Sequence, residues 1–177
     1  MKNANRRAEV LLTEAEAFGT LATETGRPYA RADMESAWRD VLFNQFHDIL
    51  PGSSIHEVYV DAPERYRAAE EIARHELDGA LAALAGQADT RAAKGTPVLV
   101  FNPLGWTRSD PVRVELPRDA AGPWAVFDAA GREVPAQVLP SGRYGAEILF
   151  VAQDVPALGH ALFDLRQQRP APMNTSL

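Results

Sequence analysis

The chain has 177 residues, of which 46% are hydrophobic and 24% charged, values typical of soluble globular proteins, so a disordered tail is excluded. Its net charge of −6 argues against a nucleic-acid-binding protein, which would carry a basic patch. The chain contains no cysteine, which excludes disulfides and thiolate zinc sites.

No apolar stretch at the start of the chain has the length of a secretory signal. No stretch reaches the roughly 18 apolar residues of a membrane span. A chain without cysteine is also compatible with a reducing compartment. We therefore expect a cytoplasmic protein that binds neither membrane nor nucleic acid.

Two helices are predicted in the first 50 residues. Residues 6–23 carry apolar side chains at helical spacing, and Gly26 and Pro28 then end the pattern. A second helical pattern covers residues 31–47, and it cannot continue past Pro51.

The third helix has two possible starts. It begins either at Ser54, where Ser-Ile-His-Glu fits a capping box, or at Asp61, which places Pro63 in the first turn. In both cases it continues to about residue 85. Short connections between three helices favour a small helical bundle.

The second half of the chain favours β-strands. Residues 86–95 are small and polar, as expected of a linker. Short β-branched runs follow at 97–101, 112–116, 124–128, 133–139, 148–151 and 161–165. We expect 124–139 to form a hairpin with Pro135 at an edge, and the last two runs to pair with each other.

The predicted fold class is therefore α+β, with two domains. A helical domain, a three-helix bundle, covers residues 1–90. A β-rich region covers residues 96–177 and forms an incomplete antiparallel sandwich, because the polar stretch from residue 167 onward has no closing strand pattern.

The end of the second helix holds the candidate site. On a helical wheel His47 lies opposite the core-facing side, close to Phe43 and Asn44. The core-facing side is formed by Trp38, Leu42, Gln45 and Ile49. An aromatic residue beside His47 and Asp48 on an outward face predicts a surface that another domain or chain covers.

Two interpretations of His47 remain open from spacing alone. A neutral imidazole is a common zinc ligand, and the carboxylate of Asp48 can bind metal or hydroxyl groups. A catalytic zinc site needs three protein ligands, however, and His56 lies nine residues further on, beyond a Pro-Gly turn. Alternatively, His47 interacts with the last carbonyl groups of its helix.

A different class of function is a non-catalytic module that binds carbohydrate or another protein. In that interpretation Trp106 or Tyr144 of the β half would hold a glycan or a partner, or Phe43 would mark a protein interface.

Several segments resemble glycoside hydrolase family 38 α-mannosidases. Residues 44–55, Asn-Gln-Phe-His-Asp-Ile-Leu-Pro-Gly-Ser-Ser-Ile, resemble the bacterial form of that family's His-Asp metal segment. Residues 100–104, Val-Phe-Asn-Pro-Leu, resemble the opening of its β-rich C-terminal region, and residues 150–159 resemble a later strand pair there. The resemblance extends over about residues 5–166.

This resemblance implies a zinc-dependent retaining α-mannosidase that hydrolyses terminal α-linked mannose. It implies that His47 is a ligand of Zn2+ and that Asp48 contacts hydroxyl groups of the bound sugar. In the family, a catalytic β/α barrel precedes the helical domain, and it would cover the face that carries Phe43 and His47.

Nothing before Arg6 matches that barrel. The other metal ligands and both catalytic carboxylates are therefore not found in this chain. We expect the chain alone to be inactive and not to retain zinc.

Overall fold

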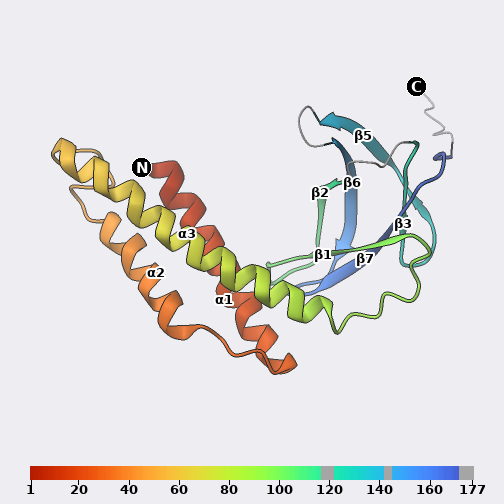
Figure 1. Ribbon diagram of the computed structural model, residues 1–177, viewed down its shortest axis with the longest axis horizontal. Coiled ribbons are helices and arrows are strands. Elements are labelled where there is room, and N and C mark those ends of the chain that lie inside the picture. Colours follow the sequence, from red (N-terminus) through yellow and green to blue (C-terminus); the bar gives the residue numbers. More distant parts are fainter. Residues whose placement is uncertain (117–121, 142–144, 172–177) are drawn as a thin grey trace. The chain divides into compact units, whose positions relative to one another are not determined.

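The computed structural model describes residues 1–116, 122–141 and 145–171 (Figure 1). Within these ranges three α-helices are followed by β-strands that form two antiparallel sheets. The chain divides into two compact units, one of residues Met1–Ala88 and a second that begins at Asp89. The predicted α+β class is confirmed.

The first unit contains α1 (Lys2–Ala22), a short 3-10 helix η1 (Thr23–Thr25), α2 (Arg31–Asn44) and α3 (His56–Ala85). Gly26, with φ of +87°, ends the first helical segment as predicted. The predicted second helix was too long, because α2 ends at Asn44 instead of His47. No helix in the described ranges is both long enough and apolar enough to cross a membrane.

The start of α3 differs from both predictions. The helix begins at His56, and Ile55 occupies the position before it without a side-chain cap. The capping box at Ser54 is therefore wrong, and so is the start at Asp61. Pro63 lies inside the helix, within the first turns.

The core of this unit is built from alanines and a few larger apolar side chains of all three helices. It contains Ala8, Leu12 and Ala15 of α1, Met34, Ala37 and Val41 of α2, and Tyr66, Ala69 and Ala73 of α3. Alanine at these positions allows the helices to approach closely, so that they pack without large gaps.

This packing rotates α2 from its predicted orientation. Leu42, placed in the core from the sequence, is 57% exposed, whereas Asn44, placed outside, is fully buried. The buried face of α2 is Met34, Ala37, Val41 and Asn44. Trp38 is half-buried and packs against the edge of the core.

The second unit contains β1 (Thr96–Phe101), β2 (Arg108–Glu115), β3 (Ala125–Asp128), β4 (Glu133–Val134), β5 (Ala136–Ser141), β6 (Gly145–Val155) and β7 (His160–Arg166). One sheet has the order β1-β7-β3-β4 and the other β2-β6-β5, with antiparallel neighbours throughout. Pro135 separates β4 from β5, and each of these strands forms the edge of a different sheet. An edge position is expected for Pro135, because proline has no amide hydrogen to donate to a neighbouring strand.

Both sheets contribute to one apolar core. Val126 and Phe163 of the first sheet meet Ile148 and Phe150 of the second. The rings of Phe150 and Phe163 lie 4.9 Å apart between their centroids. The predicted pairing of the last two strands is wrong, because β6 and β7 belong to opposite sheets and contact each other through their side chains in this core.

Candidate functional site

The turns between α2 and α3 carry His47 and Asp48. Residues 45–55 contain bends and turns after α2 ends, at one end of the helical unit (Figure 1). The His47 side chain is 77% exposed and the Asp48 side chain 55%, with 3.4 Å between Nε2 and Oδ2. The imidazole and the carboxylate therefore lie next to each other and are open to solvent, which confirms the outward direction predicted for His47.

A polar network fixes the end of α2 from the inside. The Gln45 side-chain amide donates hydrogen bonds to Oδ1 of Asn5, at 3.1 Å, and to Oε1 of Glu9, at 2.8 Å. The hydroxyl of Tyr66 donates to the same oxygen of Asn5, at 3.2 Å. Burial, and then the charge of Glu9, raises the pKa of Tyr66, so this hydroxyl keeps its proton. Gln45, two positions before His47, is thus bonded directly to α1, and the Asn5 oxygen that it shares with Tyr66 links it to α3.

Asn44 provides a second connection between α2 and α3. Its Nδ2 donates to the carbonyl oxygen of Ala62, at 2.9 Å. Its Oδ1 is buried and has no hydrogen-bond partner among the described residues. A buried polar atom without a partner is unfavourable, so this connection is made at some cost in stability.

The hydroxyl of Tyr59, in the first turns of α3, contacts the backbone on both sides of the Pro51–Gly52 turn. It accepts a hydrogen bond from the amide of Ser54, at 2.8 Å. It also lies 3.2 Å from the carbonyl oxygen of Asp48 and 3.4 Å from that of Ile49. No sequence pattern predicts this role for Tyr59, because the contact depends on the fold of the intervening turns.

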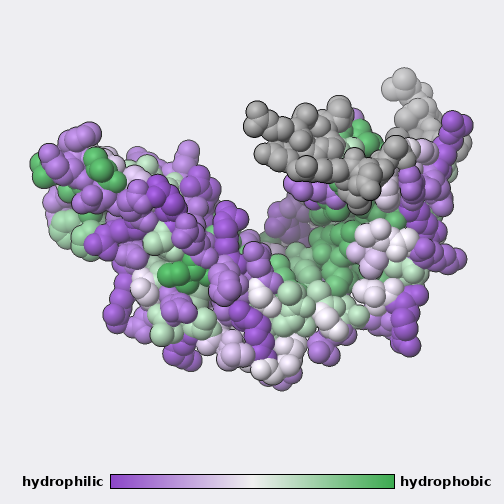
Figure 2. All heavy atoms as spheres, in the orientation of Figure 1, coloured by the Kyte–Doolittle hydropathy of each residue, from purple (hydrophilic) through white to green (hydrophobic). Residues whose placement is uncertain are grey.

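Exposed apolar side chains precede and follow His47 in the chain. The ring of Phe46 lies 4.2 Å from the His47 ring between centroids. We define the apolar rim as Leu42, Phe43, Phe46, Ile55 and Val60, all of them more than half exposed. Figure 2 shows hydrophobic residues at this end of the helical unit. The exposure of Phe43 was predicted, and a rim of this size is typical of a surface that binds another domain.

The residues present fit only a part of a zinc site. Imidazole nitrogen and carboxylate oxygen are donors that zinc accepts. Among the described residues, however, no group of three His, Cys, Asp or Glu side chains converges, and His56 does not complete one. The alternative in which His47 interacts with the last carbonyls of α2 is not favoured, because the His47 side chain is 77% exposed and the polar group beside it among the described residues is the Asp48 carboxylate.

Trp106 is the other predicted binding residue that the structure describes. It is 63% exposed, in the loop after β1. The side-chain amide of Asn102 donates to the Trp106 carbonyl oxygen, at 2.7 Å, and holds this loop. Tyr144, the second candidate, lies outside the described residues.

The chain is similar to known α-mannosidases in sequence. Residues 1–84 match the family model of the α-mannosidase middle domain. α-Mannosidase 2C1 of Mus musculus is 34% identical over 66% of this chain. The lysosomal α-mannosidase of Felis catus is 32% identical over 89% of this chain.

Solved structures share the fold. A protein of glycosyl hydrolase family 38 from Enterococcus faecalis has a TM-score of 0.78, with 23% identity over 99% of this chain. An α-mannosidase from Enterococcus faecalis V583 has a TM-score of 0.75, with 21% identity over 97% of this chain.

The chain spans only a small part of each relative. It covers 11% of the mouse protein and 17% of the cat protein. It covers 25% and 24% of the two bacterial chains.

Proposed function

The chain belongs to the α-mannosidases of glycoside hydrolase family 38, and on this premise we propose that it supplies one metal ligand and one sugar-binding carboxylate to a zinc-dependent enzyme. The observation that carries the proposal is the exposed pair of His47 and Asp48, which follows the anchored Gln45 in the chain and lies beside the ring of Phe46. The substrate class is terminal α-linked mannose.

His47 and Asp48 have different roles in this proposal. The neutral imidazole of His47 donates a nitrogen lone pair to the metal. The carboxylate of Asp48 accepts hydrogen bonds from hydroxyl groups of the sugar. When bound, zinc would supply Lewis acidity and a template for the 2- and 3-hydroxyl groups of mannose.

We propose that a catalytic domain outside this chain supplies the remaining ligands and both catalytic carboxylates. In a retaining glycosidase one carboxylate attacks the anomeric carbon while the other protonates the departing oxygen, and water then releases the sugar. The same domain would cover the apolar rim, since large exposed apolar surfaces are otherwise unfavourable. The chain alone would therefore be inactive and would not retain zinc. The cytoplasmic location stays a prediction.

The test combines the chain with the catalytic domain of the same protein, expressed separately. Hydrolysis of an aryl α-mannoside is measured with added zinc, for each piece alone and for the mixture. We expect activity only in the mixture, its loss in His47→Ala, and a large decrease in Asp48→Asn. His56→Ala is the matched control, because His56 is also exposed in the same region.

Two results would contradict the proposal. One is an associated mixture without α-mannosidase activity, and the other is a mixture in which His47→Ala and His56→Ala retain equal activity. Sugar-dependent fluorescence of Trp106 that is unaffected by His47→Ala would instead favour the carbohydrate-binding module.

A further inference from the structure

The turns that carry His47 and Asp48 are mostly exposed, so their shape depends on few contacts. Pro51, Gly52 and Ser53 are exposed to solvent. Gly52 has a φ of +99°, which an L side chain rarely adopts. The side chain of Ile49, by contrast, is only 6% exposed.

The backbone hydrogen bonds inside these turns are local. The amide of Ile49 donates to the carbonyl of Phe46, at 2.9 Å, and the amide of Gly52 donates to that of Ile49, at 3.2 Å. The amide of Leu50 also donates to the carbonyl of Phe46, at 3.1 Å. These bonds join residues three or four apart, so they define single turns and none joins the first part of the segment to its last part.

The Tyr59 hydroxyl joins these two parts. It accepts the Ser54 amide hydrogen after the Pro51–Gly52 turn. It shares its own proton between the carbonyl oxygens of Asp48 and Ile49 before that turn. A hydroxyl has one proton and two lone pairs, and this arrangement uses the proton and one lone pair.

We infer that Tyr59 is a positioning residue for His47 and Asp48 and that it acts through the backbone of the turn. The effect that we expect on zinc binding rests on the proposed function. The carbonyl that Tyr59 holds belongs to Asp48 itself, directly after His47. The hydrogen bond restrains the backbone directly at Asp48 and, one residue earlier, at His47, so it limits the directions that both side chains can take. Removing a group that orients a metal ligand typically lowers the metal affinity by about 10- to 100-fold.

The first experiment uses the full chain without metal. Tyr59→Phe removes the hydroxyl and keeps the ring. We expect the Ser54 amide to exchange its hydrogen about fivefold faster, as for the loss of one ordinary hydrogen bond. The NMR signals of the His47 imidazole should also shift. Unchanged exchange at Ser54 together with unchanged His47 signals would overturn the inference.

Tyr66→Phe is the matched control. It removes a tyrosine hydroxyl from the same helix, one that bonds Asn5 instead of the turn. We expect this variant to unfold at a lower temperature while Ser54 exchanges at the wild-type rate. If hydrogen exchange at Ser54 becomes equally faster in both variants, the cause is the lower stability of the helical unit and not the loss of the Tyr59 contact. That result would overturn the inference.

The second experiment measures zinc affinity by competition with a chelator, in the chain combined with its catalytic domain. We expect the dissociation constant to rise about tenfold in Tyr59→Phe. If His47→Ala weakens zinc binding and Tyr59→Phe does not, the positioning inference is overturned while the proposed function stands. If His47→Ala has no effect on zinc affinity, the proposed function fails and the inference falls with it.

Discussion

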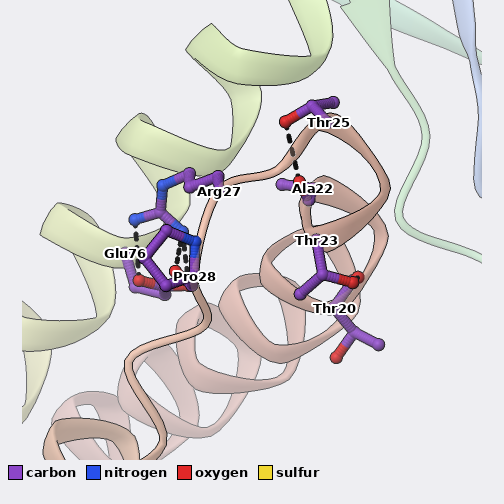
Figure 3. Close-up of polar contacts among 7 residues, drawn as sticks. All are labelled: Thr20, Ala22, Thr23, Thr25, Arg27, Pro28 and Glu76. Atoms are coloured by element: carbon purple, nitrogen blue, oxygen red, sulfur yellow. Dashed lines mark hydrogen bonds and ion pairs between the residues drawn. The ribbon is translucent and has the colours of Figure 1, made fainter.

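The guanidinium of Arg27 donates two parallel hydrogen bonds to the carboxylate of Glu76, at 2.7 and 2.8 Å, and that carboxylate is 1% exposed (Figure 3). The pair connects the segment after η1 to α3. Two glycines leave room for it. A Cβ atom at Gly19 would lie 2.6 Å from Oε1 of Glu76, and one at Gly79 would lie 2.7 Å from Nη2 of Arg27. A side chain at Gly19 of α1 or at Gly79 of α3 would therefore force the ion pair to shift.

Arg27→Met should destabilise the helical unit strongly, because it leaves the buried carboxylate of Glu76 without its partner. Breaking a buried ion pair costs about 3–5 kcal/mol, and we expect the lower end because Arg27 is 21% exposed. Denaturant unfolding of the full chain, followed by helical circular dichroism, measures the change. Arg39→Met is the control, since it breaks the exposed pair with Glu35 and should change little. Equal unfolding midpoints for the two variants would contradict the prediction.

The helices could be predicted from sequence because apolar spacing and helix-ending residues are local signals. Gly26 and Pro28 marked the end of the first helical segment correctly. The orientation of α2 could not be predicted in the same way. A helical wheel based on the spacing of large apolar residues places Leu42 inside, whereas close packing against two neighbours buries the smaller Ala37 and leaves Leu42 exposed.

The candidate site was predicted in part for a similar reason. His47 and Asp48 are consecutive, so their proximity follows from the sequence. The contacts that hold them do not, because Gln45 bonds Asn5 forty residues away and Tyr59 reaches the turn only after α2 and α3 have packed. These contacts depend on the tertiary fold and leave no periodic signal in the chain.

Asp164 should make the β unit sensitive to acid. This buried carboxylate accepts hydrogen bonds from the amides of Lys94 and Gly95, both at 2.8 Å, and from Nε of Arg166, at 2.7 Å. Burial alone would raise the pKa of Asp164, but these bonds outweigh it and lower the pKa below its usual value. The stabilisation is therefore complete above the unfolded pKa of about 4 and is lost as the pH falls through the lower folded pKa.

Asp164→Asn should accordingly lower the free energy of unfolding by about 2 kcal/mol at neutral pH, because charge-assisted hydrogen bonds are lost. The difference from wild type should become smaller below pH ~4, since Asp164 of the unfolded chain then binds a proton that the folded carboxylate takes up only at a lower pH. Thermal unfolding of both proteins at neutral pH and near pH 2 measures this difference in stability. A difference that stays constant over this range would contradict the prediction.

The apolar rim should determine the association with the catalytic domain. Leu42→Glu with Val60→Glu places two charges on the rim without changing His47 or Tyr59. Desolvating these charges at an interface should weaken binding by at least about tenfold, while the stability of the chain alone stays unchanged. Titration calorimetry against the separate domain measures the affinity. Val10→Glu is the control, because Val10 is 44% exposed on α1 but lies outside the rim. Equal effects of the rim and control substitutions would argue against a specific interface.

Asn44→Asp should introduce a pH-dependent loss of stability at the end of α2. The protonated carboxyl group can still donate to the carbonyl of Ala62, as the amide does now, whereas the ionised group cannot and is buried. Its folded pKa should therefore lie above the unfolded value of about 3.9. The variant should be close to wild type below pH ~4 and then lose about 1.4 kcal/mol per pH unit until the folded pKa is reached.

Urea unfolding of this variant at pH 4 and at pH 7 measures that loss, with Asn44→Leu as the control. Leucine is larger than asparagine but has a similarly branched side chain and no ionisable group, so any difference between Asn44→Leu and wild type should be the same at both pH values. A difference for Asn44→Asp that is equally independent of pH would mean that water reaches the carboxylate. The unpartnered Oδ1 of Asn44 would then lie at a hydrated position, and the connection between α2 and α3 would cost less stability than its burial indicates.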